Sequence, residues 1–259
     1  MTIRFSTGLR NALAQGYGFG GIMNRGYMKI WTGSQPATPD AVETGTLCGT
    51  ITLSSGTLTK ETRATGTIAL SGTLSGSITI VTVGTVNIIP DLAGAGVPYN
   101  TSLIQTASDL ADAINRNGYY SASNSGTATV TISPRPGTGT LHNSYVVAVT
   151  ATGMTATPGN MSAGGVAPVN ALILASPSAG VVSKPSAAVW SMSGLGTYTA
   201  GWFRYYGSND PEGATSTVLY PRMDGTCGVG SGDAQLSSLA VSSGSPHTID
   251  VFSFTVPAA

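Results

Sequence analysis

Charged residues are scarce in this chain of 259 residues. It has 11 Lys and Arg and 11 Asp and Glu, with a formal net charge of zero. The charged fraction is 8%, against about 25% in an average soluble domain. Without a basic excess there is no electrostatic case for nucleic-acid binding. A surface with so few charges gives little electrostatic repulsion between copies of the protein. We therefore expect a homo-oligomer, and the alternative is a Thr-rich β protein that stays soluble as a monomer.

Cysteine is nearly absent as well, and two residues cannot make a disulfide scaffold. Cys48 and Cys227 lie in distant parts of the chain, each within an expected strand. A disulfide between them would need Cα atoms within about 7 Å. In a reducing cytoplasm two buried free thiols are the favoured interpretation, and a Cys48–Cys227 disulfide is the alternative.

Long apolar runs are also lacking. None approaches the roughly 20 residues that a membrane-spanning helix needs. The first residues, "MTIRFSTGLRNALAQGYG", have no basic segment, apolar core and small-residue cleavage site of a signal peptide. We therefore expect a protein without a membrane partner that is made in the cytoplasm.

No signature of catalysis or metal binding occurs in the sequence. His142 and His247 have no carboxylate or cysteine at ligand spacing, and neither G-x-S-x-G nor H-E-x-x-H occurs. Asp210 and Glu212 in "GSNDPEGA" could offer oxygens to calcium, but calcium needs six to eight of them, so a solvated turn is favoured. The expectation is a protein that is not an enzyme and has no cofactor or metal.

Short alternating runs dominate what is present. With 35 Gly and 14 Pro, turns must be frequent, and the regular spacing of apolar residues argues against disorder. One example is "YMKIWTG" at residues 27–33, and another is "GWFRYYG", each with side chains that alternate between two faces. Strands with turn signals every 8–12 residues predict a mainly β fold, here a β-sandwich or jelly-roll-like domain.

One segment departs from this alternating pattern, because "TASDLADAINR" at residues 106–116 predicts a helix. Thr106 is the predicted N-cap, and Asp109 follows it at the spacing of a capping box. An apolar stripe lies over a polar face that includes Asn115; its members are Ala107, Leu110, Ala111 and Ile114. A helix of about three turns needs a sheet under such a stripe.

The helix marks an inserted α+β domain. We predict an insertion at residues 61–167, with residues 157–168 as its return linker, inside a discontinuous β domain of residues 27–60 plus 168–259. Insertion at an exposed loop tip costs little stability. Residues 1–26 are predicted to form a Gly-rich N-terminal arm with a short helix after the N-cap Ser6, able to order on a neighbouring subunit.

The outer segments resemble a group of structural proteins of tailed bacteriophages. The matching motifs are "STGLRNAL", "KIWTGSQPATPDA", "AGVVSKPSAAVW", "TAGWFRYYG" and the final "FTVP". They cover about 150 residues in order. The inserted segment is the part in which this chain differs from simpler relatives of that group, whose outer segments would follow each other directly. The resemblance implies a virion component without catalysis, partnered by other virion proteins, assembled in the host cytoplasm and located in the virion.

The resemblance does not fix where on the particle the protein lies, and three positions or roles are considered. The first is capsid decoration or cement, and the second is a tail or head–tail connector position. The third is a receptor- or glycan-binding adhesin, whose contact residues would be Trp202, Tyr205, Tyr206, Asp210 and Glu212. Together with Trp31 and Trp190, Trp202 could also line a sugar site, although a core or interface role is the more usual one for tryptophan.

Overall fold

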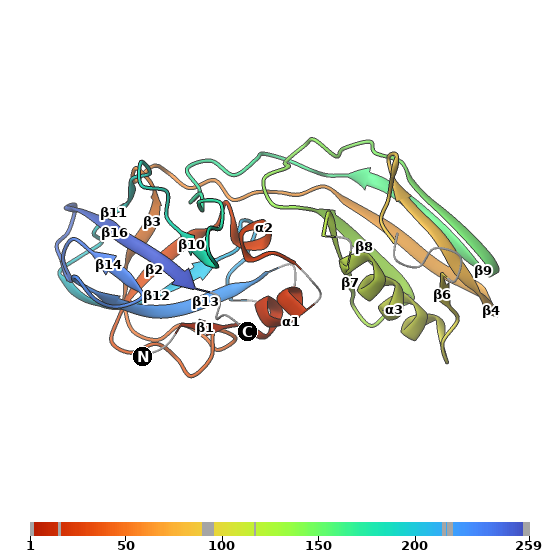
Figure 1. Ribbon diagram of the computed structural model, residues 1–259, viewed down its shortest axis with the longest axis horizontal. Coiled ribbons are helices and arrows are strands. Elements are labelled where there is room, and N and C mark those ends of the chain that lie inside the picture. The colour runs from red at the N-terminus through yellow and green to blue at the C-terminus, as the bar shows by residue number, and fades with distance from the viewer. Residues whose placement is uncertain are drawn as a thin grey trace. The chain divides into compact units, whose positions relative to one another are not determined.

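The chain is mainly β in a computed structural model that describes residues 3–14, 17–89, 96–116, 118–213, 216 and 220–255 (Figure 1). The helices of this described part are α1 (Thr7–Ala14), α2 (Phe19–Met23) and α3 (Leu103–Asn115). No helix among the described residues is long and apolar enough to cross a membrane.

The chain divides into two compact units, which we call the barrel unit and the inserted unit. The barrel unit comprises Met1–Asn11, Phe19–Glu61 and Pro168–Ala259, and the inserted unit comprises Ala12–Gly18 and Thr62–Ala167. The predicted limits of the insert were residues 60/61 and 167/168, close to those of the structure, and Ala12–Gly18 was not predicted to belong to it.

In the described part of the chain, the barrel unit is built on one sheet of ten strands. Its strands are β1 (Arg4–Phe5), β2 (Tyr27–Thr32), β3 (Leu47–Leu53), β10 (Val181–Ser183), β11 (Trp190–Ser193), β12 (Tyr198–Tyr206), β13 (Arg222–Gly228), β14 (Ala234–Leu236), β15 (Ala240–Val241) and β16 (Pro246–Thr255). The order β13-β14-β16-β11-β3-β2-β12 returns to β13, because β12 and β13 also pair. Seven strands therefore close into a barrel.

The predicted sandwich was wrong, although the mainly β class is confirmed. Alternation within a strand reports which side chains share a face, and it is the same in sandwiches and barrels. Closure depends on the pairing of β13 with both β12 and β14, and β14 runs parallel to it. Such long-range pairing has no local sequence signal.

A cluster of aromatic rings fills the core of the barrel unit. Phe252 lies near the centre, with its ring centroid 5.4 Å from Trp190, 5.9 Å from Phe203 and 6.0 Å from Tyr205. All four side chains are buried. Rings at these separations attract one another beyond the area that they bury.

The described part of the predicted N-terminal arm packs on its own chain, and the short helix predicted after Ser6 is present as α1. β1 pairs with β13, and Phe19 of α2 packs at 4.5 Å between ring centroids on Phe254. Leu9 and Met23 are fully buried. Burial of these apolar side chains stabilises the packing of the N-terminal segment on the rest of its own chain. The predicted cap is confirmed, since the Ser6 hydroxyl accepts from the Leu9 N–H at 3.1 Å.

Over its described residues, the inserted unit has a six-stranded sheet covered by α3. Its strands are β4 (Thr65–Val83), β5 (Val86–Asn87), β6 (Val97–Pro98), β7 (Tyr120–Asn124), β8 (Thr129–Pro134) and β9 (Val147–Ser162). The predicted stripe is confirmed, because its four members are buried in this core; they are Ala107, Leu110, Ala111 and Ile114.

Two details of the helix prediction were wrong. The N-cap is Ser102, whose hydroxyl accepts from Gln105 N–H at 3.1 Å, and Thr106 lies inside the helix. Both residues can cap, and partial burial of Leu103 against the core favours the earlier start. Asn115 is buried rather than exposed, because its amide pairs with both backbone groups of Ala122 at 2.7 and 3.0 Å.

β4 and β9 form a long two-stranded ribbon that turns back on itself. At about 3.3 Å per residue, a straight strand would hold Val147 and Asn160 about 40 Å apart. Instead the Val147 N–H donates to the Asn160 side chain at 3.1 Å. The bend falls where the register shifts between Gly72 and Gly76.

The predicted linker at residues 157–168 was partly wrong, since β9 continues through Pro158 and Gly159 to Ser162. β4 is the only strand of the described chain that pairs with β9. β9 is therefore an edge strand, and a proline is tolerated there because one row of its N–H groups has no partner strand.

Candidate binding sites

The aromatic residues predicted to contact a ligand or partner are inside the barrel unit, which corrects that prediction. Trp202, Tyr205 and Tyr206 are each at most 1% exposed. The sequence pattern of β12 separates two faces correctly, but both faces are covered. Trp202 donates its indole N–H to Thr44 O at 3.3 Å, so the loop before β3 closes over the outer face.

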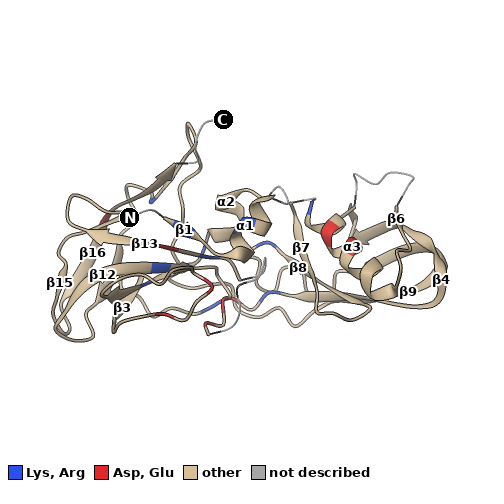
Figure 2. Cartoon of the chain, turned by 90° about the horizontal axis from the view of Figure 1, so that it is seen from below, with Lys and Arg blue, Asp and Glu red and all other residues tan. Residues whose placement is uncertain are grey.

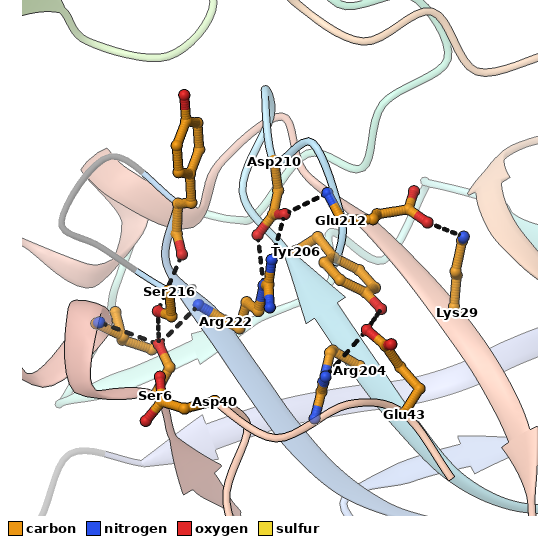
Figure 3. A network of polar contacts seen from close by, with 12 residues as sticks. Ser6, Lys29, Asp40, Glu43, Arg204, Tyr206, Asp210, Glu212, Ser216 and Arg222 are labelled. Carbon is orange, nitrogen blue, oxygen red and sulfur yellow. Dashed lines mark hydrogen bonds and ion pairs between the residues drawn. The ribbon is translucent and has the colours of Figure 1, made fainter. Parts of the chain in front are cut away.

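Arg204 on β12 is the centre of a buried polar network (Figure 3). Its guanidinium binds Asp224 through two hydrogen bonds of 2.7 and 2.8 Å, and both side chains are fully buried. It also donates to Glu43 Oε1 at 3.0 Å and to Ala41 O at 2.8 Å. Tyr206 donates to the same Glu43 carboxylate at 2.6 Å. Paired charges of this kind are costly to separate.

Asp210 and Arg222 form a second buried pair. Arg222 donates from Nε and Nη2 to the two carboxylate oxygens of Asp210, at 2.7 and 2.8 Å. Asp210 also accepts from the Glu212 N–H at 2.8 Å, which fixes the loop after β12. The predicted solvated turn was therefore wrong at Asp210, because its carboxylate is fully buried and used inside the protein.

Glu212 lies at the partly open end of this network. Its carboxylate accepts from the Tyr27 hydroxyl at 2.8 Å, from Lys60 Nζ at 2.6 Å and from Lys29 Nζ. Burial alone would raise the pKa of Glu212, but the hydrogen bonds from Lys29, Lys60 and Tyr27 outweigh it and lower the pKa to about 2. Glu212 is thus an ionised anchor for three side chains.

No metal site appears at these acidic residues. Among the described residues, no group of three or more His, Cys, Asp and Glu side chains is arranged to hold a metal ion. A polar pocket of about 400 Å³ lies beside Glu212; its other lining residues include Tyr27, Lys29, Thr50, Thr52 and Ser55. Since Lys29 and Glu212 are paired with each other there, the pocket has no unbalanced charge to attract an ion.

Acid should weaken the barrel unit through Glu212. The folded pKa of about 2 lies below the unfolded value of 4.5. The stabilisation is therefore complete above pH 4.5 and is lost as the pH falls through about 2. We expect the urea midpoint of the wild type, followed by Trp fluorescence, to fall over this range. Glu212→Gln should be less stable at neutral pH and show a shallower acid slope.

The control for this titration is Asp250→Asn, which changes an exposed carboxylate. It should leave the urea midpoint at neutral pH close to that of the wild type. A Glu212→Gln variant with an unchanged acid slope would contradict the role of Glu212 as an anchor.

Both cysteines are free thiols in the structure. Burial raises the pKa of Cys48 to about 11. Burial also raises the pKa of Cys227, and the nearby Cys48 and Asp233 raise it further. Both thiols are therefore protonated and unreactive at neutral pH.

The inserted unit has a larger pocket of about 560 Å³ that the sequence analysis missed. It is lined by Val86, Tyr119, Tyr120, Arg135, Thr138, His142 and Tyr145. His142 was interpreted as an ordinary turn residue, but its ring lies 5.6 Å from Tyr120 and 4.9 Å from Tyr145. The only sequence signal was the density of aromatic residues in the turns before β7 and β9.

No protein-family model, curated protein or solved structure matches this chain. Its function must therefore be argued from its own residues and from the motifs named above.

Proposed function

We propose that the chain is a structural component of a tailed-phage virion, acting as a capsid decoration or cement protein. The observation that carries the proposal is the uncharged edge strand β9. Over its 16 residues it contains no charged side chain, and neither does its partner β4 over 19 residues. Figure 2 shows the ribbon without a charged stretch.

Such an edge is unusual for a protein that acts alone. Soluble proteins commonly protect edge strands with lysine, proline or bulges, since free N–H and C=O groups can pair with another chain. In β9 the only proline is Pro158, near its end, and Val147–Thr157 has neither charge nor proline, so its protection is limited to the register shifts opposite Thr150–Met154. Pairing between the β9 edges of neighbouring copies would satisfy these groups.

Contacts of this kind suit a cement role because the symmetry of a particle repeats them between many copies. An uncharged edge gives each pair of copies a modest attraction, and symmetry repeats it many times over a particle. The low charge of the whole chain reduces the repulsion between copies. The outer motifs "STGLRNAL" and "TAGWFRYYG" support the same class of protein by resemblance.

Quantitative mass spectrometry of purified particles tests the proposal. A decoration protein should survive salt washing with a copy number close to that of the major capsid protein. About a dozen copies or fewer would instead favour the tail or connector position. Absence from washed particles, combined with binding of the isolated protein to the host envelope, would favour the adhesin and contradict the proposal.

A further inference from the structure

The aromatic pocket of the inserted unit lies outside the contacts proposed above. Two of its tyrosines remain largely accessible, with Tyr119 63% and Tyr145 40% exposed. Val86 beside them is 42% exposed. Its volume of about 560 Å³ is within the range of about 300–1,000 Å³ typical of ligand sites. The pocket therefore offers apolar surface to a ligand of moderate size.

The same residues place hydrogen-bonding groups at the edges of the rings. Tyr119 and Tyr145 end in hydroxyls, and Thr138 adds a third. Burial lowers the pKa of His142, so its ring is neutral at pH 7. A fitting ligand has apolar faces for the rings and polar edges for these groups, as a sugar ring does.

Charge narrows the class of ligand further. Among the described residues, Arg135 is the one charged side chain that lines the pocket, and no described carboxylate lines it. Its guanidinium carbon lies 5.0 Å from the centroid of the Tyr119 ring, and its Nε donates to Gly118 O. These two contacts hold the cation at the pocket wall, and no carboxylate of the described part of the chain forms an ion pair with it. A bound carboxylate would satisfy it through a charge-assisted hydrogen bond.

We propose that this pocket binds an oligosaccharide that carries a carboxylate, with a sugar ring stacked on Tyr119 and Tyr145 and the acid group on Arg135. The site lies wholly within the inserted unit. It does not depend on where the protein sits on a particle, so the proposal can be tested with the purified full-length chain.

The test is an array of oligosaccharides that carry uronic or sialic acids, together with neutral counterparts of the same backbone. The wild type should bind one or more of the acidic members and bind the neutral counterpart at least about tenfold more weakly. Affinities of the hits would then be measured by titration calorimetry.

Variants of the pocket tie the binding to these residues. Tyr119→Ala and Arg135→Gln should each weaken it about tenfold or more. Arg116→Gln removes a cation of the same unit, and Ile104→Ala an exposed apolar side chain of α3, neither of which lines the pocket. Both should stay within about twofold of the wild type, and near-UV circular dichroism should show that all four variants are folded.

Three outcomes would overturn the proposal. They are failure of every acidic oligosaccharide to bind, equal binding of the neutral counterparts, and binding that both pocket variants leave unchanged. None of them bears on the copy number of the chain in particles, so this proposal and the virion proposal can fail separately.

Discussion

Asp224→Ala is expected to lower the free energy of unfolding of the barrel unit by about 3–5 kcal/mol. Arg204 is fully buried, and two of its hydrogen bonds go to Asp224. Removing that carboxylate leaves a cation in the interior with Glu43 as its remaining acidic partner. Urea unfolding followed by Trp fluorescence measures the loss, because the three tryptophans all belong to the barrel unit.

Two comparisons sharpen this experiment. Asp250→Ala, at an exposed carboxylate, should cost less than about 0.5 kcal/mol. The double variant Arg204→Met with Asp224→Leu should recover part of the stability, because an apolar pair leaves less charge unpartnered. A loss below about 1 kcal/mol in Asp224→Ala would show that the pair is not what holds β12 and β13 together at this point.

Gly76→Ala is expected to cost the inserted unit more than about 3 kcal/mol. Gly76 has φ +93° at the bend of the ribbon, and a Cβ there would lie 1.7 Å from Thr152 O. The added methyl group would therefore have to push β4 and β9 apart where they pair. Amide hydrogen exchange in α3 and β8 measures the effect on this unit, which contains no tryptophan.

Gly126→Ala is the matched control for this substitution. Gly126 also has a positive φ of +77°, but a Cβ there would meet nothing within 4 Å. Gly126→Ala introduces the backbone strain without the steric clash, so it should lower the free energy of unfolding by about 1–2 kcal/mol. Equal losses in the two variants would mean that strain alone matters and that the close approach at the bend does not.

Local patterns predicted the elements well. The stripe Ala107–Leu110–Ala111–Ile114 gave α3 and its buried face, and alternation gave β2 and β12. Periodicity works here because each element has one face against a core and shows it in its own residues. The predicted start of α3 at Thr106 was wrong, since Ser102 is also able to cap and the packing of Leu103 favours the earlier start.

What failed depended on contacts between distant segments. The alternation of β12 could not reveal that the loop carrying Glu43 and Thr44 covers its outer face. The aromatic residues of β12 therefore resembled a contact surface although they are core. The aromatic pocket was invisible for the same reason, since its lining comes from separate parts of the chain: Val86 is in β5, Tyr119 precedes β7, and His142 and Tyr145 share the turn before β9.

The most direct test of the virion proposal combines particle occupancy with a change at the β9 edge. Thr150→Lys puts a charge on the exposed edge strand, whereas Thr127→Lys adds the same charge in the turn between β7 and β8. Each variant would replace the wild-type protein during phage growth, and its copy number per washed particle would be measured by mass spectrometry. We expect wild-type occupancy for Thr127→Lys and a loss of about tenfold or more for Thr150→Lys. Equal occupancy of the two variants, or absence of the wild-type chain from washed particles, would contradict the account.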